Sequence, residues 1–398
     1  MSEAPWLTIV GCGEDGLDGL STASRAAIAT AEIVMGAARH LDLIDEIEGQ
    51  TEIWPVPFAD GIDQLLSHRG RQVVVLASGD PFWFGTGSVF ARHLVPEEWH
   101  CLPAPSTFSI AAAYTGWPLE KTLCLGLHAR PFTVLRPYLA SGLRAIVLVR
   151  DGKAVPVLAA YLTELGFGDS TMTVMEALGG PRQKVRSTIA KTFRILDIAH
   201  PVCVAIKVAG DGIPVPLATG RADDFFDHNG QITKRPVRAL ALSALAPRFG
   251  EHLWDIGAGS GSISVEWLLS GPSLTATAFE SRPDRAGQVT VNADRFGLSL
   301  PVIQGTAPAC LIDKTLPDAV FVGGGASEDL FHWLWCNLPL GTRVVVHGVT
   351  LETEALLPQW HAAKGGQLMR IDLSEASPLG TRRGWKAAYP VMQWSVTV

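Results

Sequence analysis

The sequence predicts an α/β protein built from two successive domains. The chain has 398 residues, and a single domain usually holds roughly 100–200. In both halves, β-rich runs alternate with helical stretches, the pattern of sheets whose strands are joined by helices. A stretch rich in Pro, Gly and Asp separates the halves, as an interdomain linker does. We therefore expect a first domain over 1–210, a linker leading into the second domain over 211–236, and a second domain over 237–398.

In the first domain, short runs rich in β-branched residues predict the strands. These runs span 6–12, 32–37, 52–56, 72–78, 100–104, 144–149, 171–178, 184–190 and 202–209. Helices are expected to follow Leu20, Ala59, Gly85, Ser106, Phe132 and Ala154. The alternation favours largely parallel sheets. The turn Gly179-Gly180-Pro181 predicts one hairpin, between the strands over 171–178 and 184–190.

The second domain repeats the alternation more regularly. Its strands are expected over 252–256, 275–280, 301–304, 318–322, 343–347, 367–373 and 389–396. Its helices are expected over 260–269, 283–296, 328–337 and 352–363. The last two strands follow each other without a helix, so they should pair antiparallel. A mostly parallel sheet that ends in this way is a doubly wound variant.

The composition favours a folded, cytoplasmic protein. Hydrophobic residues make up 47% and charged residues 18%, which is ample for full cores. The longest apolar runs fall far short of the roughly 20 residues that span a bilayer. No basic and apolar leader is visible at the start. We therefore expect no membrane partner.

Charge and metal-ligand spacing exclude two further classes of partner. The net charge is −7, and residues 1–230 carry 18 Lys and Arg against 25 Asp and Glu, whereas residues 231–398 carry 14 of each. Neither half has the basic field that a nucleic-acid duplex requires, so no nucleic acid is expected. The six cysteines form no CxxC pair, and the histidines form no zinc-ligand pattern. No metal site is expected.

A glycine-rich loop in the second half predicts a ligand site. Asp255-Ile256-Gly257-Ala258-Gly259-Ser260-Gly261 follows a strand and opens a helix, and glycine lets backbone approach a ligand closely. Glu280 ends the next strand, where a carboxylate can accept both hydroxyls of a ribose. The dinucleotide motif is G-x-G-x-x-G, whereas these glycines are spaced G-x-G-x-G. Asp255 would oppose a pyrophosphate but suit an ammonium group. A methyl donor is therefore favoured over a dinucleotide or a plain structural turn.

These residues give the second half a resemblance to class I (Rossmann-like) S-adenosylmethionine-dependent methyltransferases, over about 232–398. Ala307 follows the strand where that fold lines its adenine pocket, and Gly323-Gly324-Gly325 leaves room for a bulky, flat acceptor. Thr233-Lys234, just before the first helix, resembles the decarboxylating precorrin methyltransferases of corrin-ring synthesis. An ordinary helix cap is the alternative role for Thr233. The resemblance implies donor contacts at Thr233, Asp255, Gly257, Ala258, Gly259, Ser260, Gly261, Glu280 and Ala307.

Three loops at strand ends predict another site in the first half. They are Gly11-Cys12-Gly13-Glu14-Asp15-Gly16, Gly79-Asp80-Pro81 and Pro105-Ser106-Thr107. Small residues at three strand ends favour a joint site over three independent turns. Over about 5–210 these loops resemble the tetrapyrrole methylase (class III) fold, in which two α/β lobes hold S-adenosylmethionine in a cleft. The resemblance implies donor contacts at Gly11, Gly13, Gly79, Asp80, Pro81, Ser106 and Thr107.

The first loop departs from the usual Gly-x-Gly-Pro-Gly of that superfamily and resembles its precorrin-6Y branch, as does Leu127-His128-Ala129-Arg130. His128 and Arg130 are expected to end a strand that points at the cleft and are the candidate catalytic residues. Arg130 would hold an acetate or propionate side chain, and His128 would move a proton. A capping histidine and a surface ion pair are equally open. Arg382, Arg383 and Trp385 are expected in a loop before the last strand.

The whole chain resembles the precorrin-6Y methyltransferase family of cobalamin (corrin) synthesis, which fuses the two folds. The resemblance implies a bifunctional enzyme that uses S-adenosylmethionine and acts on a small tetrapyrrole, precorrin-6B. The first domain would methylate carbon 5. The second would methylate carbon 15 and decarboxylate the carbon-12 acetate. Both fold families usually self-associate, so a homo-oligomer is expected. The alternatives are a methyltransferase for another small molecule or RNA, a donor-binding regulatory protein, and a dehydrogenase.

Overall fold

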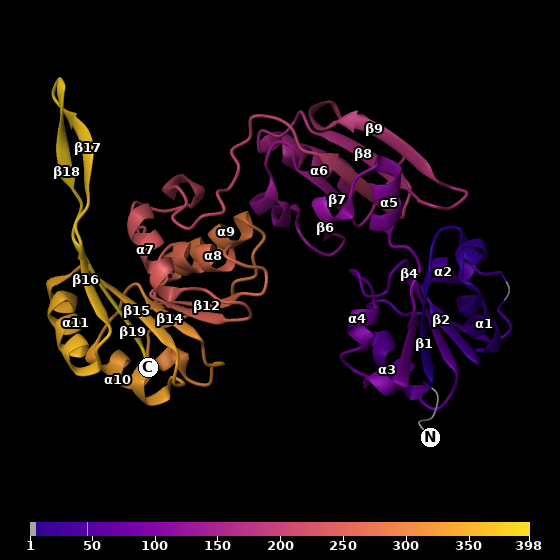
Figure 1. The fold of residues 1–398 in the computed structure, drawn as a ribbon, viewed down its shortest axis with the longest axis horizontal. Coiled ribbons are helices and arrows are strands. Elements are labelled where there is room, and N and C mark those ends of the chain that lie inside the picture. The colour runs from indigo at the N-terminus through magenta and orange to yellow at the C-terminus, as the bar shows by residue number, and fades with distance from the viewer. Residues whose placement is uncertain (1–4, 46) are drawn as a thin grey trace. The chain divides into compact units, whose positions relative to one another are not determined.

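The computed structural model describes residues 5–45 and 47–398, and the chain forms two compact units (Figure 1). The first unit comprises the chain up to Pro131 together with Leu139–Ile213. The second comprises Phe132–Tyr138 and Pro214–Val398. Among the described helices, none is both long and apolar enough to cross a bilayer.

The first sheet of the first unit is entirely parallel, as expected. Its order is β3-β2-β4-β1-β5, with β1 at Leu7–Cys12, β2 at Ile33–Gly36, β3 at Gln50–Ile53, β4 at Val73–Ser78 and β5 at Trp99–Leu102. The intervening helices are α1 (Thr22–Thr30), α2 (Ala38–Asp42), α3 (Asp60–Ser67) and α4 (Gly87–Phe90). Residues 73–77 of the central strand are buried on both faces, which explains their continuous run of apolar side chains.

The second sheet of this unit is mostly antiparallel, so the expectation of largely parallel strands is wrong here. Its order is β6-β7-β10-β8-β9, with β6 at Leu123–Gly126, β7 at Arg144–Leu148, β8 at Thr171–Glu176, β9 at Lys184–Ile189 and β10 at Val202–Lys207. Its helices are α5 (Thr107–Thr115) and α6 (Ala154–Glu164). Only β6 and β7 run parallel. The predicted hairpin at Gly179-Gly180-Pro181 is confirmed. Its short turn reverses the chain, so β8 and β9 must run antiparallel, because a parallel pair needs a long crossover connection.

Two further local expectations for the first half change. β6 lies outside the β-branched runs, and the strand expected to end at His128 and Arg130 ends instead at Gly126. The residues after Phe132 form the 3₁₀ helix η4 (Phe132–Tyr138) rather than an α-helix. Pro137 lies inside this segment and cannot donate the backbone hydrogen bond that an α-helix requires.

The second unit is built on a seven-stranded sheet in the order β13-β12-β11-β14-β15-β19-β16. The strands are β11 (His252–Ile256), β12 (Thr275–Glu280), β13 (Val302–Gln304), β14 (Ala319–Val322), β15 (Arg343–Gly348), β16 (Gln367–Ile371) and β19 (Val391–Thr397). The helices are α7 (Arg235–Leu245), α8 (Ser262–Leu268), α9 (Pro283–Arg295), α10 (Glu328–Asn337) and α11 (Leu351–Lys364). The predicted antiparallel pairing of β16 with β19 is confirmed. The architecture is the predicted doubly wound sheet.

A hairpin between β16 and β19 corrects one expectation. β17 (Ser374–Leu379) pairs antiparallel with β18 (Arg382–Ala387), and the pair extends away from the sheet (Figure 1). Arg382, Arg383 and Trp385 therefore lie on a strand and not in a loop. These three side chains are exposed. Most residues of the hairpin face solvent, so no alternation of buried and exposed residues identifies it in the sequence.

Several aromatic side chains pack among aliphatic ones in a core cluster of this unit. Phe331 of α10 is fully buried and meets the rings of Trp360 and Trp394 edge-on, with centroids 5.2 and 5.8 Å apart. Leu242, Ile263, Trp267 and Phe321 are among the residues that fill a separate core cluster of the same unit. These cores hold the sheet and its helices in fixed register, so the strand ends that carry the candidate site are set by close packing.

Phe331→Ala is expected to destabilise the second unit by about 3–5 kcal/mol, because it removes a ring that packs against two others and leaves a cavity. Urea denaturation, monitored by hydrogen exchange of peptides from α10, measures this. Val291→Ala is the control, since Val291 lies half-exposed on α9 and should change the free energy of unfolding by about 0.5 kcal/mol or less. A loss below about 1 kcal/mol for Phe331→Ala would contradict this account of the core.

Candidate active sites

The three predicted loops of the first unit meet at the carboxyl ends of neighbouring strands β4, β1 and β5. A Cβ atom on Gly11 would lie 2.0 Å from the carbonyl oxygen of Gly79 and 2.5 Å from the amide nitrogen of Ala104. The Gly79 amide donates to the carbonyl of Cys12 at 2.9 Å, and Gly79 has a φ of +54°. Only glycine satisfies both the close approach and the left-handed backbone.

These loops border a cavity of about 730 Å³. That volume is typical of a small-molecule site. Of the predicted donor contacts in this half, the lining includes Gly13, Gly79, Asp80, Ser106 and Thr107. Gly11 and Pro81 lie outside the described lining. They support it instead: Gly11 permits the loop contact described above, and the Pro81 carbonyl accepts a hydrogen bond from the Gly87 amide at 2.8 Å.

Local capping explains why these loops hold their shape. Ser106 is the N-cap of α5, and its hydroxyl accepts from the Ser109 amide at 3.1 Å. The Asp80 carboxylate accepts from the Phe82 amide at 2.8 Å, which closes a tight turn. The N-terminus of α5, with its free N–H groups, therefore begins at residues that line the cavity.

Aromatic rings form another part of the lining. Trp83 and Phe84 are partly exposed, and each packs against Phe108, with ring centroids 5.2 and 5.7 Å apart. Phe84 has a φ of +56°, which is costly for a bulky residue and is found mainly where function requires it. Such a wall suits a flat, conjugated ligand.

Sequence reasoning missed a polar cluster in the same cavity. Glu14 is buried, and its carboxylate pairs with Arg39 and, at 2.9 Å, with Arg182. Arg39 also donates to the hydroxyl of Ser78 at 2.9 Å. Burial, helped by the Arg39 charge, lowers the pKa of His40 to about 4, so its ring is neutral near pH 7. The sequence signal for this cluster is the position of Arg39 and His40, which lie in α2, and α2 begins two residues beyond the end of β2 at Gly36.

The two candidate catalytic residues lie differently from the expectation. β6 ends at Gly126, so His128 and Arg130 do not end a strand and lie instead in the turn that follows. The Arg130 amide turns back to the Leu127 carbonyl at 3.4 Å, which ends the extended run. Both side chains are exposed. His128 lines the cavity, whereas Arg130 lies outside its described lining.

In the second unit, two glycine loops lie against each other at the ends of β11 and β14. A Cβ on Gly257 would lie 2.6 Å from the carbonyl oxygen of Gly324. Gly257, Gly259 and Gly261 have φ values of +68°, +59° and +71°. All three positions therefore require glycine's backbone freedom. A Cβ on Gly324 would meet no atom within 4 Å, so the edge of this loop is open.

The two acidic residues of this site are both buried against the loop. Glu280 accepts hydrogen bonds from the Gly259 amide at 2.9 Å and the Arg282 amide at 3.0 Å. One Asp255 oxygen accepts from the amide and hydroxyl of Ser264 at 3.2 and 2.6 Å. Its other oxygen, Oδ1, has no hydrogen-bond partner among the described residues. Burial, reinforced by the nearby Glu280 charge, raises the pKa of Asp255 to about 6.

The remaining predicted contacts are Ala258 and Ser260 of the loop itself, Thr233 before α7 and Ala307 beyond β13. Ser260 follows Ala258 and Gly259, and its carbonyl accepts from the Asn292 side chain at 2.8 Å. Thr233 is half-buried and lies one residue before Lys234, the N-cap of α7, so the helix-cap alternative for Thr233 is wrong. Ala307 is half-buried beyond β13 and packs against the aromatic core. Within the described residues, no group of three or more potential metal ligands occurs.

Two protein families match the chain, one over each half. The tetrapyrrole (corrin/porphyrin) methylases match residues 6–193, and the precorrin methyltransferase domain matches residues 224–398. A precorrin-6Y C(5,15)-methyltransferase (decarboxylating) of Sinorhizobium sp is 47% identical, covering 99% of this chain and 97% of its own length. One from Mycobacterium tuberculosis is 38% identical over 98% of this chain and 99% of its own. A cobalt-precorrin-6B C(15)-methyltransferase (decarboxylating) of Salmonella typhimurium is 37% identical over 41% of this chain and 87% of its own.

The raised pKa of Asp255 predicts a specific pH dependence of stability. Its folded pKa of about 6 exceeds the ordinary value of 3.8, so the folded state holds the proton more tightly than the unfolded state. Stability is therefore lost as pH rises through this window and levels off above it. Between pH 4.5 and 7.5 the wild type should lose about 2 kcal/mol relative to Asp255→Asn, which has no proton to lose.

Urea denaturation at both pH values, monitored by hydrogen exchange of α8 peptides, measures this difference. Asp313→Asn serves as the control because Asp313 is exposed and should leave the pH profile unchanged. If the free energy of unfolding of the wild type and of Asp255→Asn changed with pH in the same way, the raised pKa would not belong to Asp255.

Proposed function

The chain belongs to the family of decarboxylating precorrin-6Y C5,15-methyltransferases, and from that premise we propose that it is a bifunctional C-methyltransferase of cobalamin synthesis. It methylates precorrin-6B at carbons 5 and 15 and removes the carboxyl group of the carbon-12 acetate. One observation carries the proposal: each unit has its own glycine-lined cradle at the carboxyl ends of parallel strands. Each cradle lies in the part of the chain that matches a different methyltransferase family.

The family requires a methyl donor, and the residues present fit S-adenosylmethionine. In the second unit, Glu280 lies beside the Gly259 amide, where its carboxylate would accept the ribose hydroxyls. The buried and unpartnered Oδ1 of Asp255 is an acceptor next to the same loop, suited to the donor's ammonium end directly or through water. In the first unit, Gly79, Ser106 and Thr107 would hold the donor along the cavity. When bound, the donor supplies an already activated methyl group on its sulfonium.

Positioning is the main task that remains for the protein. A meso carbon of a reduced tetrapyrrole is an enamine-like nucleophile, and holding it in line with the methyl group is worth roughly 7–11 kcal/mol. Trp83 and Phe84 present a wall on which a flat macrocycle can lie in the first unit. The open edge at Gly324 leaves room for such a ring in the second. His128 lines the cavity and is the proposed group for moving a proton there. Arg130 is proposed to meet a carboxylate at the ring's periphery.

We assign carbon 5 to the first unit and carbon 15 with decarboxylation to the second. The Salmonella relative, whose name pairs C15 methylation with decarboxylation, matches less than half of this chain. The precorrin methyltransferase family matches residues 224–398. For the decarboxylation, the conjugated ring can accept the electron pair left when the carbon–carboxyl bond breaks. The protein would contribute an apolar surrounding that disfavours the carboxylate.

Blocking one cradle at a time tests this division. Gly79→Arg and Gly259→Arg each place a large cation in one cradle. Incubation with precorrin-6B and labelled donor, followed by mass spectrometry and measurement of carbon dioxide, reports the outcome. Gly79→Arg should yield one methyl addition with release of carbon dioxide. Gly259→Arg should yield one methyl addition without it.

Each variant has a matched control at the other end of the same strand. Gly70 precedes β4 and Gly250 precedes β11, and both have positive φ values with no atom within 4 Å of an added Cβ. Gly70→Arg and Gly250→Arg also place a side chain at a positive φ but should keep both methylations. Loss of both methylations in folded Gly79→Arg or Gly259→Arg would overturn the two-site assignment.

Ligand stabilisation separates the donor from the dehydrogenase alternative. S-adenosylhomocysteine at 100 times its Kd should raise the free energy of unfolding by about 2.7 kcal/mol per occupied site, and the melting temperature should rise accordingly. NAD at the same concentration should leave the melting temperature unchanged. Differential scanning fluorimetry measures both. Stabilisation by NAD and not by S-adenosylhomocysteine would overturn the assignment of the donor.

A further inference from the structure

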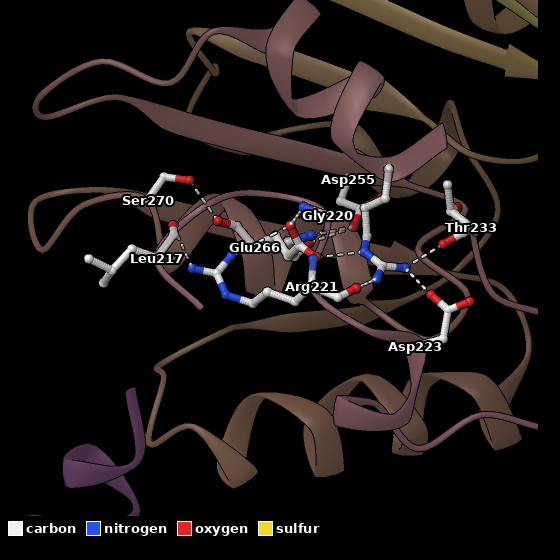
Figure 2. A network of polar contacts seen from close by, with 10 residues as sticks. Leu217, Gly220, Arg221, Asp223, Thr233, Asp255, Glu266 and Ser270 are labelled. Atoms are coloured by element: carbon white, nitrogen blue, oxygen red, sulfur yellow. Dashed lines mark hydrogen bonds and ion pairs between the residues drawn. The ribbon is translucent and has the colours of Figure 1, made fainter. Parts of the chain in front are cut away.

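Residues 220–233, which the sequence predicts to be linker, are bonded to the helices of the second unit at three places. The first place is Glu266 of α8, which is fully buried and accepts from the Gly220 amide at 2.6 Å and the Arg221 amide at 2.9 Å. Figure 2 shows Glu266 at the centre of this network, with Arg221 and Asp223 on the segment beside it. An acceptor that serves two consecutive backbone amides fixes the course of the chain there.

The second place is Arg238 of α7, which is also fully buried. Its Nε donates to Glu266 at 2.7 Å, and it pairs with Asp223 at 3.1 Å. A further guanidinium nitrogen donates to the carbonyl of Thr233, and another to the carbonyl of Arg221. One planar group therefore joins both ends of the segment to α8. Glu266 also pairs with the buried Arg221 guanidinium at 3.5 Å, so two arginines share the carboxylates of Glu266 and Asp223. These contacts hold the Arg238 side chain in place.

The third place is Asn292 of α9, which is fully buried and uses all of its polar atoms. Its Oδ1 accepts from the Asp227 amide at 2.7 Å. Its Nδ2 donates to the carbonyl of Asp227 at 2.9 Å and to the carbonyl of Ser260 at 2.8 Å. A single amide thus clamps the middle of the segment to the glycine-rich loop itself.

The end points of these bonds have a property in common. Thr233 and Ser260, whose carbonyls Arg238 and Asn292 hold, are both proposed donor contacts. We propose that the 220–233 segment is a working part of the second methyl-donor site, with Asn292 as the positioning residue that sets the 257–261 loop and with Glu266 and Arg238 anchoring the segment's ends. This inference rests on the proposed function, because its readout is donor binding in the second unit.

Asn292→Asp is the most specific test because it replaces only the side-chain NH2 group of Asn292 by an oxygen atom. It replaces the donating amide by an oxygen that faces two carbonyls, so the clamp becomes repulsive while the side-chain size is kept. The experiment uses the full chain carrying Gly79→Arg, so that only the second site binds. Calorimetric titration with S-adenosylhomocysteine should show a Kd at least tenfold weaker when Asn292→Asp is added. Asn337→Asp is the control for the substitution itself, since the Asn337 side chain also donates to a backbone carbonyl, that of Trp333, but is exposed and lies on α10.

Turnover with precorrin-6B separates positioning from a merely structural role. In Asn292→Asp the donor KM of the second methylation should rise at least tenfold, while kcat at saturating donor stays within threefold of the wild type. Partial unfolding would instead lower kcat and leave KM unchanged. The turnover chain carries Asn292→Asp without Gly79→Arg, so its first methylation is an internal control and should keep its donor KM.

The outcomes are distinguishable. If the Gly79→Arg chain binds no S-adenosylhomocysteine, the proposed donor site of the second unit fails. If that chain binds it and a folded Asn292→Asp changes the Kd less than tenfold, the inference fails while the function stands. Should Asn292→Asp not fold, Asp223→Asn replaces it, because Asp223 is the partly exposed member of the network. Its Kd should weaken at least threefold, and a smaller change would overturn the inference.

Discussion

Close backbone contact between glycines at neighbouring strand ends is the constraint on which both candidate sites depend. In the first unit, an added Cβ at Gly11 would collide with the backbone of Gly79 and Ala104. In the second, an added Cβ at Gly257 would collide with the backbone of Gly324. The two units differ in strand order and in where their antiparallel strands lie. Each nevertheless places its glycine-rich loops at the carboxyl ends of parallel strands. Backbone that approaches backbone this closely leaves N–H groups and space for a ligand where side chains would otherwise stand.

The distribution of charge gives the first unit a particular problem. Residues 1–230 carry the whole net charge of −7, and the proposed substrate is a polycarboxylate. The long-range field therefore disfavours its approach. Arg39, Arg150 and His128 line the cavity, but Glu14 and Asp80 line it too, and Glu14 pairs with Arg39. Substrate carboxylates must therefore meet individual arginines, because the cavity lining as a whole offers no excess of arginine over carboxylate. His40 stays neutral because burial lowers its pKa, so it adds hydrogen-bonding capacity without charge.

The second unit uses buried charge in another way. Arg238 and Glu266 are both fully buried, and a buried ion pair is weak evidence for stability by itself, because desolvation opposes the attraction. The role of this ion pair here is to hold backbone groups in position. The guanidinium and the carboxylate satisfy the backbone of residues that have no sheet or helix partner, including Gly220 and Thr233. Asn292 does the same for Asp227 and Ser260.

The sequence by itself determined the local elements and the strand-end loops. β11 and the glycines after it, the hairpin at Gly179-Gly180-Pro181, and the antiparallel end of the second sheet follow from periodicity and turn chemistry, which act over a few residues. Tertiary structure alone decided the antiparallel course of the second sheet, the exposed β17–β18 hairpin, and the place of His128 beyond β6. It also decided that residues 220–233 bond to α7, α8 and α9, although their Pro, Gly and Asp content is that of a linker. The physical reason is range: Asp227 and Asn292 are 65 positions apart, and no local pattern encodes a hydrogen bond formed only when the sheet brings them together.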